Sequence, residues 1–466
     1  MTRLNYKKVH IQFDEIKSFI RKVEFIFEIM ILSFIFFLIW KFMYHIPLLS
    51  GGGYILILIY AFIMFMLFLY SDAFKFGYMK FTDIIISQGL SIIILNCITY
   101  FQICLIAHNM ISFFSIILMT VIDIAVAFLL SLSFTAIYHK YCVPKHMIML
   151  YGRENSLLLK KKMDQRKDKY CIERMIYCDD YTFEEIITEF ENYDAVILND
   201  IKAELRNKIL KYCYGNSIRV YSVPILSDVI YSGSKDITLF DTPLKLIHGC
   251  GLSLVQRFVK RTMDLIFCLT AMIPSSFIML IVAAAIKLED GGTVFYRQKR
   301  VTRNGKKFDI LKFRSMIEDA ESDGKPHPAI DNDNRITKVG KVIRALRIDE
   351  LPQLLNIIKG DMSIVGPRPE RVEHCEIYRK DIPEFEFRNK VKGGLTGYAQ
   401  VYGKYNTTAI DKLRLDLMYI ENYSFALDIK IILMTLRILF KKESTEGFYE
   451  ADSRLKEIKE KELLRK

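Results

Sequence analysis

Cysteine spacing gives no sign of a structural metal site in this chain. The nine cysteines form no Cys-x-x-Cys pair and no cysteine–histidine cluster with zinc-like spacing. Cys97 and Cys104 lie inside an apolar run, and the others are scattered. We therefore expect reduced, unpaired thiols in a protein that faces the cytosol. The first two dozen residues are polar and basic, which is not the pattern of a cleaved signal peptide.

A glycine-rich dinucleotide fingerprint is also missing. The first expected strand-to-helix turn of the middle region reads Tyr151-Gly152-Arg153-Glu154-Asn155, with one glycine where such a site needs three. Without the other glycines, the backbone cannot approach a pyrophosphate closely. This argues against an oxidoreductase built on the middle region and favours a structural or regulatory domain.

Apolar residues and positive charge are both abundant. The chain is 52% hydrophobic and carries a formal net charge of +12. A basic excess suits either nucleic acid or anionic lipid and phosphate. The long apolar runs favour the second interpretation, so we predict a membrane protein with membrane lipid and no nucleic acid among its partners.

Four apolar runs fill the first third, each close to the ~20 residues that cross a bilayer as a helix. They are Phe25–Tyr44, Tyr54–Tyr70, Ile84–Ala107 and Ile111–Tyr138. Lys and Arg precede the first run, and Lys lies between the second and third runs and after the fourth, whereas the loops 47–53 and 108–110 have neither. The positive-inside bias predicts a cytosolic segment 1–22 and a four-helix transmembrane bundle over 23–141, with both ends cytosolic. Asp123 should face the bundle interior, in a helix–helix hydrogen bond or a functional role.

From residue 142 to 250 the pattern changes to short apolar strands that alternate with helical stretches. The expected strands are Met147–Leu150, Arg174–Cys178, Ala195–Leu198 and Ile218–Val223. This alternation predicts a parallel sheet with crossover helices, a Rossmann-like α/β domain.

A fifth apolar run, Leu265–Ile286, is long enough to span a membrane, but it has basic residues on both sides. The positive-inside bias therefore predicts that both ends of this run stay in the cytosol. Pro274 removes a helical hydrogen bond near the middle, and Ser275 and the serine after it can satisfy freed carbonyls. We predict a re-entrant membrane helix within 251–290, broken at Pro274; a straight spanning helix with a proline kink is the alternative.

The last third carries the charged motifs. Alternation along an expected strand, Asp309–Met316, places Lys312 and Arg314 on one face and Ser315 on the other. Two cations two residues apart on one face can converge on a phosphate. A solvated strand face with incidental charges is the simpler explanation of this segment taken alone.

Asp349 and Glu350 precede a short helix that ends at Gly360, and Pro352 fits only its first turn. The ordinary explanation of Asp349 is a helix N-cap. The sharper hypothesis is a carboxylate nucleophile kept ionised by the helix terminus and nearby arginines. Two adjacent acids also suit Mg²⁺.

Two further segments are rich in turn residues. In Gly366-Pro367-Arg368-Pro369, two prolines stiffen the backbone around Arg368, whose guanidinium suits phosphate recognition. In Gly393–Gln400, Thr396 and Gln400 offer a hydroxyl and an amide to a sugar or nucleotide pocket.

In their order and residue sequence, these motifs resemble those of the monotopic phosphoglycosyl transferases. Within that family, they are similar to the large-type bacterial sugar transferases of exopolysaccharide, capsule and O-antigen assembly. The similar motifs lie between about residues 260 and 440 and are Gly291–Gln298, Lys312–Met316, Asp349–Gln353 and Gly366–Pro369. The bundle and the Rossmann-like domain resemble the large-type architecture only in layout.

The resemblance implies an α+β catalytic domain over 291–442 in the bacterial inner membrane, facing the cytosol. It implies that Asp349 attacks the sugar-bearing phosphorus of a UDP-sugar, that UMP leaves, and that undecaprenyl phosphate takes the sugar-1-phosphate in a ping-pong step. Glu350 either places Mg²⁺ or handles a proton. Substrate-binding candidates are Lys312, Arg314, Ser315, Arg368, Thr396 and Gln400. No motif indicates which sugar the UDP-sugar carries. The sequence also leaves open whether the chain forms a homo-oligomer or contacts other polysaccharide-assembly proteins.

The C-terminal part returns to amphipathic helix. Ile431–Phe440, with cations around it, suits either an interfacial membrane helix or an ordinary core helix. Residues 443–466 form a densely charged tail. The alternative for the whole chain is a catalytically inactive membrane scaffold or regulator of polysaccharide assembly, and the intact Asp349–Glu350 pair argues against it.

Overall fold

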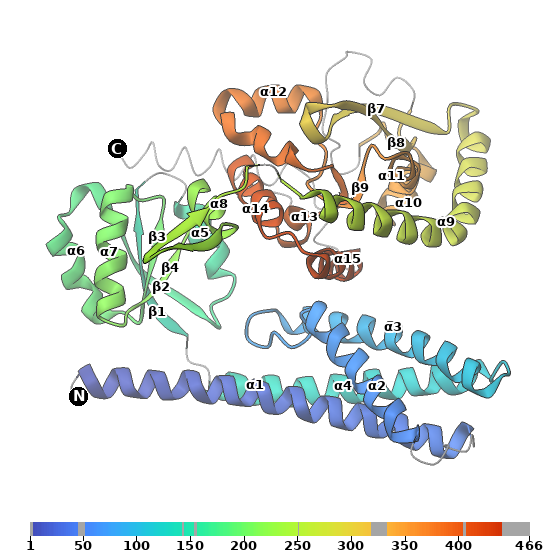
Figure 1. Cartoon of the computed structure of the whole chain (residues 1–466), viewed down its shortest axis with the longest axis horizontal. Helices are drawn as coiled ribbons and strands as arrows, with labels where there is room; N and C mark the ends of the chain where they lie inside the picture. The colour runs from blue at the N-terminus through green and yellow to red at the C-terminus, as the bar shows by residue number, and fades with distance from the viewer. Residues whose placement is uncertain are drawn as a thin grey trace. The chain divides into compact units, whose positions relative to one another are not determined.

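The computed structural model describes residues 3–44, 52–141, 144–152, 156–249, 251–317, 333–403 and 407–439. It divides into two compact units, Met1–Ile225 and Leu226–Lys466, which are described separately (Figure 1). The expected charged tail, 443–466, and the turn residues 153–155 lie outside the described residues.

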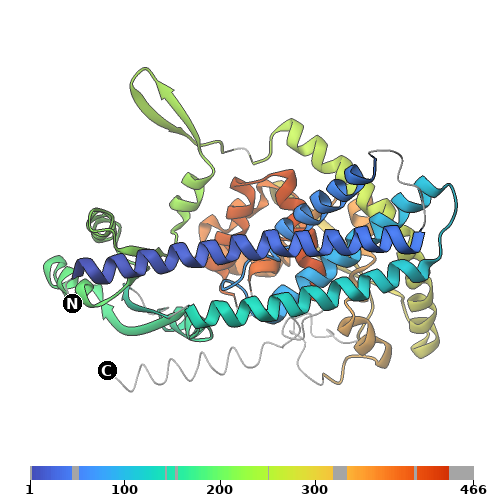
Figure 2. The same cartoon turned by 90° about the horizontal axis from the view of Figure 1, so that it is seen from below.

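The first unit begins with helices that pack on one another. They are α1 (Arg3–Ile39) continued by a π-helical turn (Trp40–Tyr44), α2 (Gly52–Tyr70), α3 (Phe81–Ala107) and α4 (Phe113–Tyr141). Figure 2 shows α1 and α4 running alongside each other. Among the described residues, four stretches are long and apolar enough to cross a membrane: 19–43, 81–107, 113–138 and 254–290; the apolar helix 54–70 is shorter.

A polar cluster lies inside this helical bundle. Asp123 of α4 is fully buried and accepts hydrogen bonds from Tyr60 Oη of α2 (3.3 Å) and Asn96 Nδ2 of α3 (3.0 Å). The prediction that Asp123 faces the interior is confirmed, and its contacts are the helix–helix hydrogen bonds expected of a polar side chain in such a bundle.

The remainder of the first unit is a parallel sheet in the order β2-β1-β3-β4. The strands are β1 (Lys145–Tyr151), β2 (Tyr170–Tyr177), β3 (Ala195–Asn199) and β4 (Arg219–Ser222). The helices between them are α5 (Ser156–Asp164), α6 (Phe183–Glu189) and α7 (Ala203–Gly215). The middle of β1 and all of β3 are buried, as expected of central parallel strands. The prediction of parallel strands with crossover helices is confirmed.

The second unit opens with α8 (Leu226–Ser232), the antiparallel hairpin β5 (Lys235–Leu239) and β6 (Thr242–Leu246), and α9 (Leu254–Asp290). An antiparallel pair follows, β7 (Phe295–Val301) and β8 (Lys307–Phe313). Then come α10 (Lys338–Ala345), a 3₁₀ turn (Ile348–Glu350), α11 (Gln353–Lys359), β9 (Ser363–Val365), α12 (Val372–Asp381), a 3₁₀ segment (Pro383–Lys390), β10 (Gly394–Thr396), α13 (Tyr398–Tyr402), α14 (Ala409–Glu421) and α15 (Phe425–Leu439).

The helix α9 runs through Pro274 without losing its helical assignment, so the predicted break is wrong in that form. Figure 1 shows instead that α9 bends sharply within its length. Ser276 Oγ donates to the carbonyl of Ile273 (2.8 Å), one turn back. Pro274 has no amide hydrogen to donate to the carbonyl four residues back, and a serine hydroxyl that bonds back to the preceding turn also favours bending, so the helix bends but continues.

The C-terminal helices supply the core of the second unit. Leu413 and Leu417 of α14 and Ile431 and Met434 of α15 are all buried in one cluster. For the described part of the segment 431–440, the core-helix alternative therefore fits better than the interfacial one.

Candidate active site

The adjacent acids lie in the 3₁₀ turn between α10 and α11. Arg347 begins this turn in the left-handed conformation (φ 55°), and Gly360 ends α11 in the same region (φ 94°), as predicted for a glycine stop. Pro352, not Asp349, occupies the N-cap position of α11. The ordinary capping explanation of Asp349 is therefore wrong.

Glu350 is held by two cations from different segments. Its Oε1 accepts from Lys312 Nζ of β8 (2.7 Å) and from Arg368 Nη2 of the Pro-Arg-Pro segment (2.5 Å). Burial alone would raise the pKa of Glu350, but Arg368 and then Lys312 outweigh it and keep the pKa well below its usual range. Glu350 is therefore ionised near neutral pH in this arrangement.

Asp349 has a different environment, although it is the next residue. Its carboxylate makes no hydrogen bond or ion pair with the described residues. Burial raises the pKa of Asp349, and the attraction of Lys312 offsets this only in part. Two neighbouring carboxylates thus have their pKa values shifted in opposite directions, which is typical of sites where acids take different roles.

The predicted convergence of Lys312 and Arg314 on one phosphate is wrong in this structure. Strand β8 ends at Phe313, so the alternation of faces does not extend to Arg314. The buried Arg314 guanidinium pairs with Asp290 and donates to the carbonyl of Thr293 (2.6 Å). Arg314 therefore fixes the end of α9, and Ser315 contributes its carbonyl to the amide of Thr337 (3.2 Å).

The Pro-Arg-Pro segment and the glycine-rich turn pack directly on each other, because β9 and β10 are parallel neighbours. A Cβ on Gly366 would lie 2.4 Å from the carbonyl oxygen of Lys392, and one on Gly394 would lie 2.1 Å from the amide of Gly366. Only glycine allows this close approach of the two backbones. The turn therefore holds the segment that presents Arg368.

Thr396 and Gln400 are bound within this framework. Thr396 Oγ1 shares a hydrogen bond with Thr435 Oγ1 of α15 (2.6 Å), and Gln400 Nε2 donates to the carbonyl of Leu395 (3.1 Å). The Thr396 hydroxyl and the Gln400 Nε2 group thus stabilise the turn and its contact with α15, whereas the sequence suggested a pocket for sugar or nucleotide; Gln400 Oε1 is buried and has no hydrogen-bond partner among the described residues.

Behind Arg368 lies a buried ionic network that the sequence pattern does not predict. Arg388 pairs with Asp416 (2.7 Å) and donates to the carbonyl of Arg368 (3.0 Å), while Glu370 pairs with Lys412 and Arg388. Burial would raise the pKa of Glu370, but the two cations lower it to about 2. Glu370 directly follows the Pro-Arg-Pro segment, which is the one available signal in the sequence; its partners are scattered charges.

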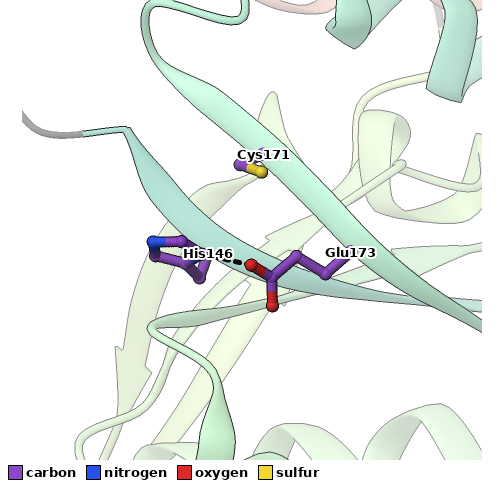
Figure 3. A group of neighbouring side chains, drawn as sticks. All are labelled: His146, Cys171 and Glu173. Atoms are coloured by element: carbon purple, nitrogen blue, oxygen red, sulfur yellow. Dashed lines mark hydrogen bonds and ion pairs between the residues drawn. The ribbon is translucent and has the colours of Figure 1, made fainter.

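Two sets of side chains could hold a metal. In the first unit, His146 of β1 lies beside Cys171 and Glu173 of β2, and its ring contacts the Glu173 carboxylate (Figure 3). A β-bulge in the β1–β2 register falls beside Glu173. A nitrogen, sulfur and oxygen set suits a transition metal more than Mg²⁺.

In the second unit, Asp349 offers a carboxylate with no partner among the described residues, and Glu350 Oε2 has one long contact, 3.5 Å to Arg368 Nη1. Carboxylate oxygens are among the ligands that Mg²⁺ takes in proteins, so these two residues could hold one.

The four helical stretches of the described residues that are long and apolar enough to cross a membrane indicate a membrane protein. Residues 255–442 match the family described as bacterial sugar transferase. The "uncharacterized sugar transferase EpsL" of Bacillus subtilis (strain 168) is 40% identical over 179 residues, 38% of this chain and 86% of that protein. The chain therefore belongs to the bacterial sugar transferase family.

Two relatives have more specific names. The UDP-N-acetylgalactosamine-undecaprenyl-phosphate N-acetylgalactosaminephosphotransferase of Aeromonas hydrophila is 38% identical over 254 residues, 53% of this chain and 59% of that protein. The UDP-glucose:undecaprenyl-phosphate glucose-1-phosphate transferase of Escherichia coli (strain K12) is 40% identical over 210 residues, 44% of this chain and 43% of that protein. The chain spans about half the length of these two relatives.

Proposed function

We propose that this protein transfers a sugar-1-phosphate from a UDP-sugar to undecaprenyl phosphate and releases UMP. The observation that carries the proposal is the separation of the acid pair: Glu350 is neutralised by Lys312 and Arg368, while Asp349 keeps an uncommitted carboxylate beside them. The family and the names of two relatives support the same reaction class.

The reaction has two displacements at one phosphorus. An Asp349 oxygen attacks the sugar-bearing phosphorus of the UDP-sugar, the bond to the bridging oxygen breaks, and UMP leaves with that oxygen. A phosphate oxygen of undecaprenyl phosphate then attacks the same phosphorus, the bond to Asp349 breaks, and the carboxylate is regenerated. Lys312 and Arg368 lie beside the acids, where they can stabilise the charge that develops on the phosphoryl oxygens.

Glu350 acts in this proposal as a fixed charge that positions other groups. Because Arg368 and Lys312 keep its pKa well below the usual range, it is a poor proton donor near neutral pH. Its carboxylate instead orients the two cations. Asp349 and Glu350 would together hold Mg²⁺, which when bound neutralises charge on the substrate diphosphate.

We further propose that α9 is re-entrant, with both ends on the cytosolic side of the bacterial inner membrane. Both halves of α9 contact the same compact unit. In the first half, Lys260 pairs with Asp428 of α15 (2.6 Å); at the far end, Glu289 accepts from the amide of Lys338 at the start of α10 (2.7 Å). A helix that crossed the bilayer would put these two contacts on opposite sides, and one compact unit could not make both.

The topology is tested by labelling with a membrane-impermeant thiol reagent. In a background without the natural cysteines, Gly249→Cys and Lys307→Cys flank α9 at exposed positions. We expect both to be labelled from the cytosolic side in oriented vesicles. Labelling of the two positions from opposite sides would show that α9 spans the membrane.

The reaction is tested by measuring UMP release from a panel of UDP-sugars with undecaprenyl phosphate and Mg²⁺. We expect one UDP-sugar to give carrier-dependent release that Asp349→Asn abolishes. Asp309→Asn is the matched control, since it makes the same carboxylate-to-amide change at an exposed position of β8. Equal release by wild type and Asp349→Asn would refute the nucleophile, and no turnover of any UDP-sugar by folded protein would favour the inactive scaffold.

A further inference from the structure

A basic cavity lies in the second unit, between the first half of α9, the turn after β7 and the segment that leads to β10. Its volume is about 130 Å³. Six cationic side chains line it: Arg257, Lys260, Arg261, Arg303, Lys390 and Lys392. None of them belongs to the Asp349–Glu350 site described above.

The cavity carries more positive charge than its surroundings neutralise. Lys260 is paired with Asp428, but Arg303 and Lys392 form no ion pair with the described residues. Among the described residues that line the cavity, the one acid is Asp264, and it already accepts from Ser363 Oγ (3.0 Å) and a backbone amide. Burial, then repulsion from neighbouring guanidinium groups, lowers the pKa of Lys392. A cluster of like charges in a partly buried cavity suits an anion that offsets the repulsion.

Two of these cations, Arg261 and Lys392, have their head groups close to each other beside Gly360 at the end of α11. A Cβ on Gly360 would lie 3.5 Å from Arg261 Nη2 and 3.6 Å from Lys392 Nζ. Arg261 also donates to the carbonyls of Ile357 and Ile358, at the end of α11. The acid pair precedes the opposite end of that helix, so the basic cavity is a separate place for an anion.

Size and surroundings indicate the kind of anion. Pockets for whole drug-sized ligands occupy roughly 300–1,000 Å³, so a cavity of about 130 Å³ suits a phosphate group better than a nucleotide-sugar. The same turns of α9 that carry Arg257 also expose Leu254, Val255 and Phe258, each more than 70% accessible. Exposed apolar side chains beside a basic cavity are typical of surfaces at the level of lipid headgroups.

We propose that this basic cavity binds the phosphate of an anionic phospholipid, while the exposed apolar residues of α9 contact its acyl chains. The bound headgroup fixes the depth at which the second unit sits in the bilayer. The site is independent of the transfer reaction, because it needs neither the UDP-sugar nor the acid pair.

The test measures binding of fluorescent phosphatidylglycerol to the full-length protein in neutral detergent by anisotropy, without UDP-sugar or carrier. We expect Arg303→Gln/Lys392→Gln to weaken binding at least about tenfold, since two charged contacts are lost. Lys341→Gln/Lys380→Gln removes two exposed cations elsewhere on the unit and should change affinity less than about twofold. Lys392→Arg should retain binding, which separates loss of the charge from loss of the fold.

Two further arms separate the sources of phosphate. Phosphatidylcholine of the same chain length should bind at least about tenfold more weakly than phosphatidylglycerol, and millimolar inorganic phosphate should not displace the lipid. Displacement by inorganic phosphate would assign the cavity to a free anion and overturn the lipid assignment. Equal loss of binding in the two double variants would overturn the assignment of the basic cavity as the binding site.

Discussion

Replacing Glu350 by glutamine should lower the stability of the protein, whereas replacing the neighbouring Asp349 by asparagine should not. Glu350→Gln leaves Lys312 and Arg368 without the anion that both contact, at 2.7 and 2.5 Å. Loss of one partner of a buried ion pair costs ~3–5 kcal/mol. The side chains of Lys312 and Arg368 are 19% and 35% exposed, so water recovers part of this cost. We therefore expect a loss of about 2–3 kcal/mol in the free energy of unfolding.

Asp349→Asn should not destabilise the protein. The Asp349 carboxylate has no partner among the described residues, and burial raises its pKa, so the neutral amide removes a desolvation cost. For a unit of this size, 1 kcal/mol corresponds to ~2–4 °C in Tm. The expected result is a Tm for Glu350→Gln roughly 5–10 °C below wild type and a Tm for Asp349→Asn equal to or above it.

Calorimetry of the full chain in detergent at pH 7 is the suitable assay, because the single tryptophan, Trp40, lies in the helical bundle and does not report on the second unit. Asp309→Asn serves again as the exposed control. Equal falls in Tm for the variants at 349 and 350 would refute the assignment of Glu350 as the shared partner of both cations.

Three other predictions follow from charged groups of the second unit. Lys312→Met should move the acid limb of the UMP-release pH profile to higher pH, because Lys312 lowers the pKa of Asp349; an unchanged limb would contradict this. The pKa of Glu370, depressed from 4.5 to about 2, gives stability that is present above pH 4.5 and lost as the pH falls toward 2, worth ~3 kcal/mol. Unfolding of Glu370→Gln should lack this pH dependence. Lys260→Met should cost ~3–5 kcal/mol by breaking the buried pair with Asp428, and Lys260→Met/Asp428→Leu should recover much of it in thermal unfolding.

The elements of the first unit could be predicted because each depends on local patterns. Apolar runs long enough to span a membrane, and the alternation of strand and helix, can be recognised from residues that are close in the sequence. Even the inward direction of Asp123 follows from the cost of a charge in lipid. Its partners, Tyr60 and Asn96, could not be predicted, since they come from two other helices whose rotation is set by packing.

The predictions that were wrong for the second unit share one physical cause: each applied a local rule where contacts distant in the sequence decide the structure. The alternation rule placed Lys312 and Arg314 on one face, but it holds only while the strand continues, and β8 ends at Phe313. Beyond that point the direction of Arg314 is set by Asp290, at the end of α9. A proline in a helical pattern likewise predicts a disturbance at Pro274, but the proline alone does not decide whether the helix breaks or bends.

Asp349 and Glu350 show most clearly what a sequence contains and what it lacks. As neighbours they share charge and local secondary structure, so the motif alone leaves open whether Glu350 places Mg²⁺ or handles a proton. Burial acts on both carboxylates, and their pKa values move apart because Arg368, eighteen residues on, and Lys312 hydrogen-bond to Glu350, whereas neither makes such a bond with Asp349. Arg368 is in turn presented by a backbone that Arg388 and the glycine turn hold in place. The division between a reactive and a positioning carboxylate therefore arises from long-range contacts, and these contacts are where variants should separate the two roles.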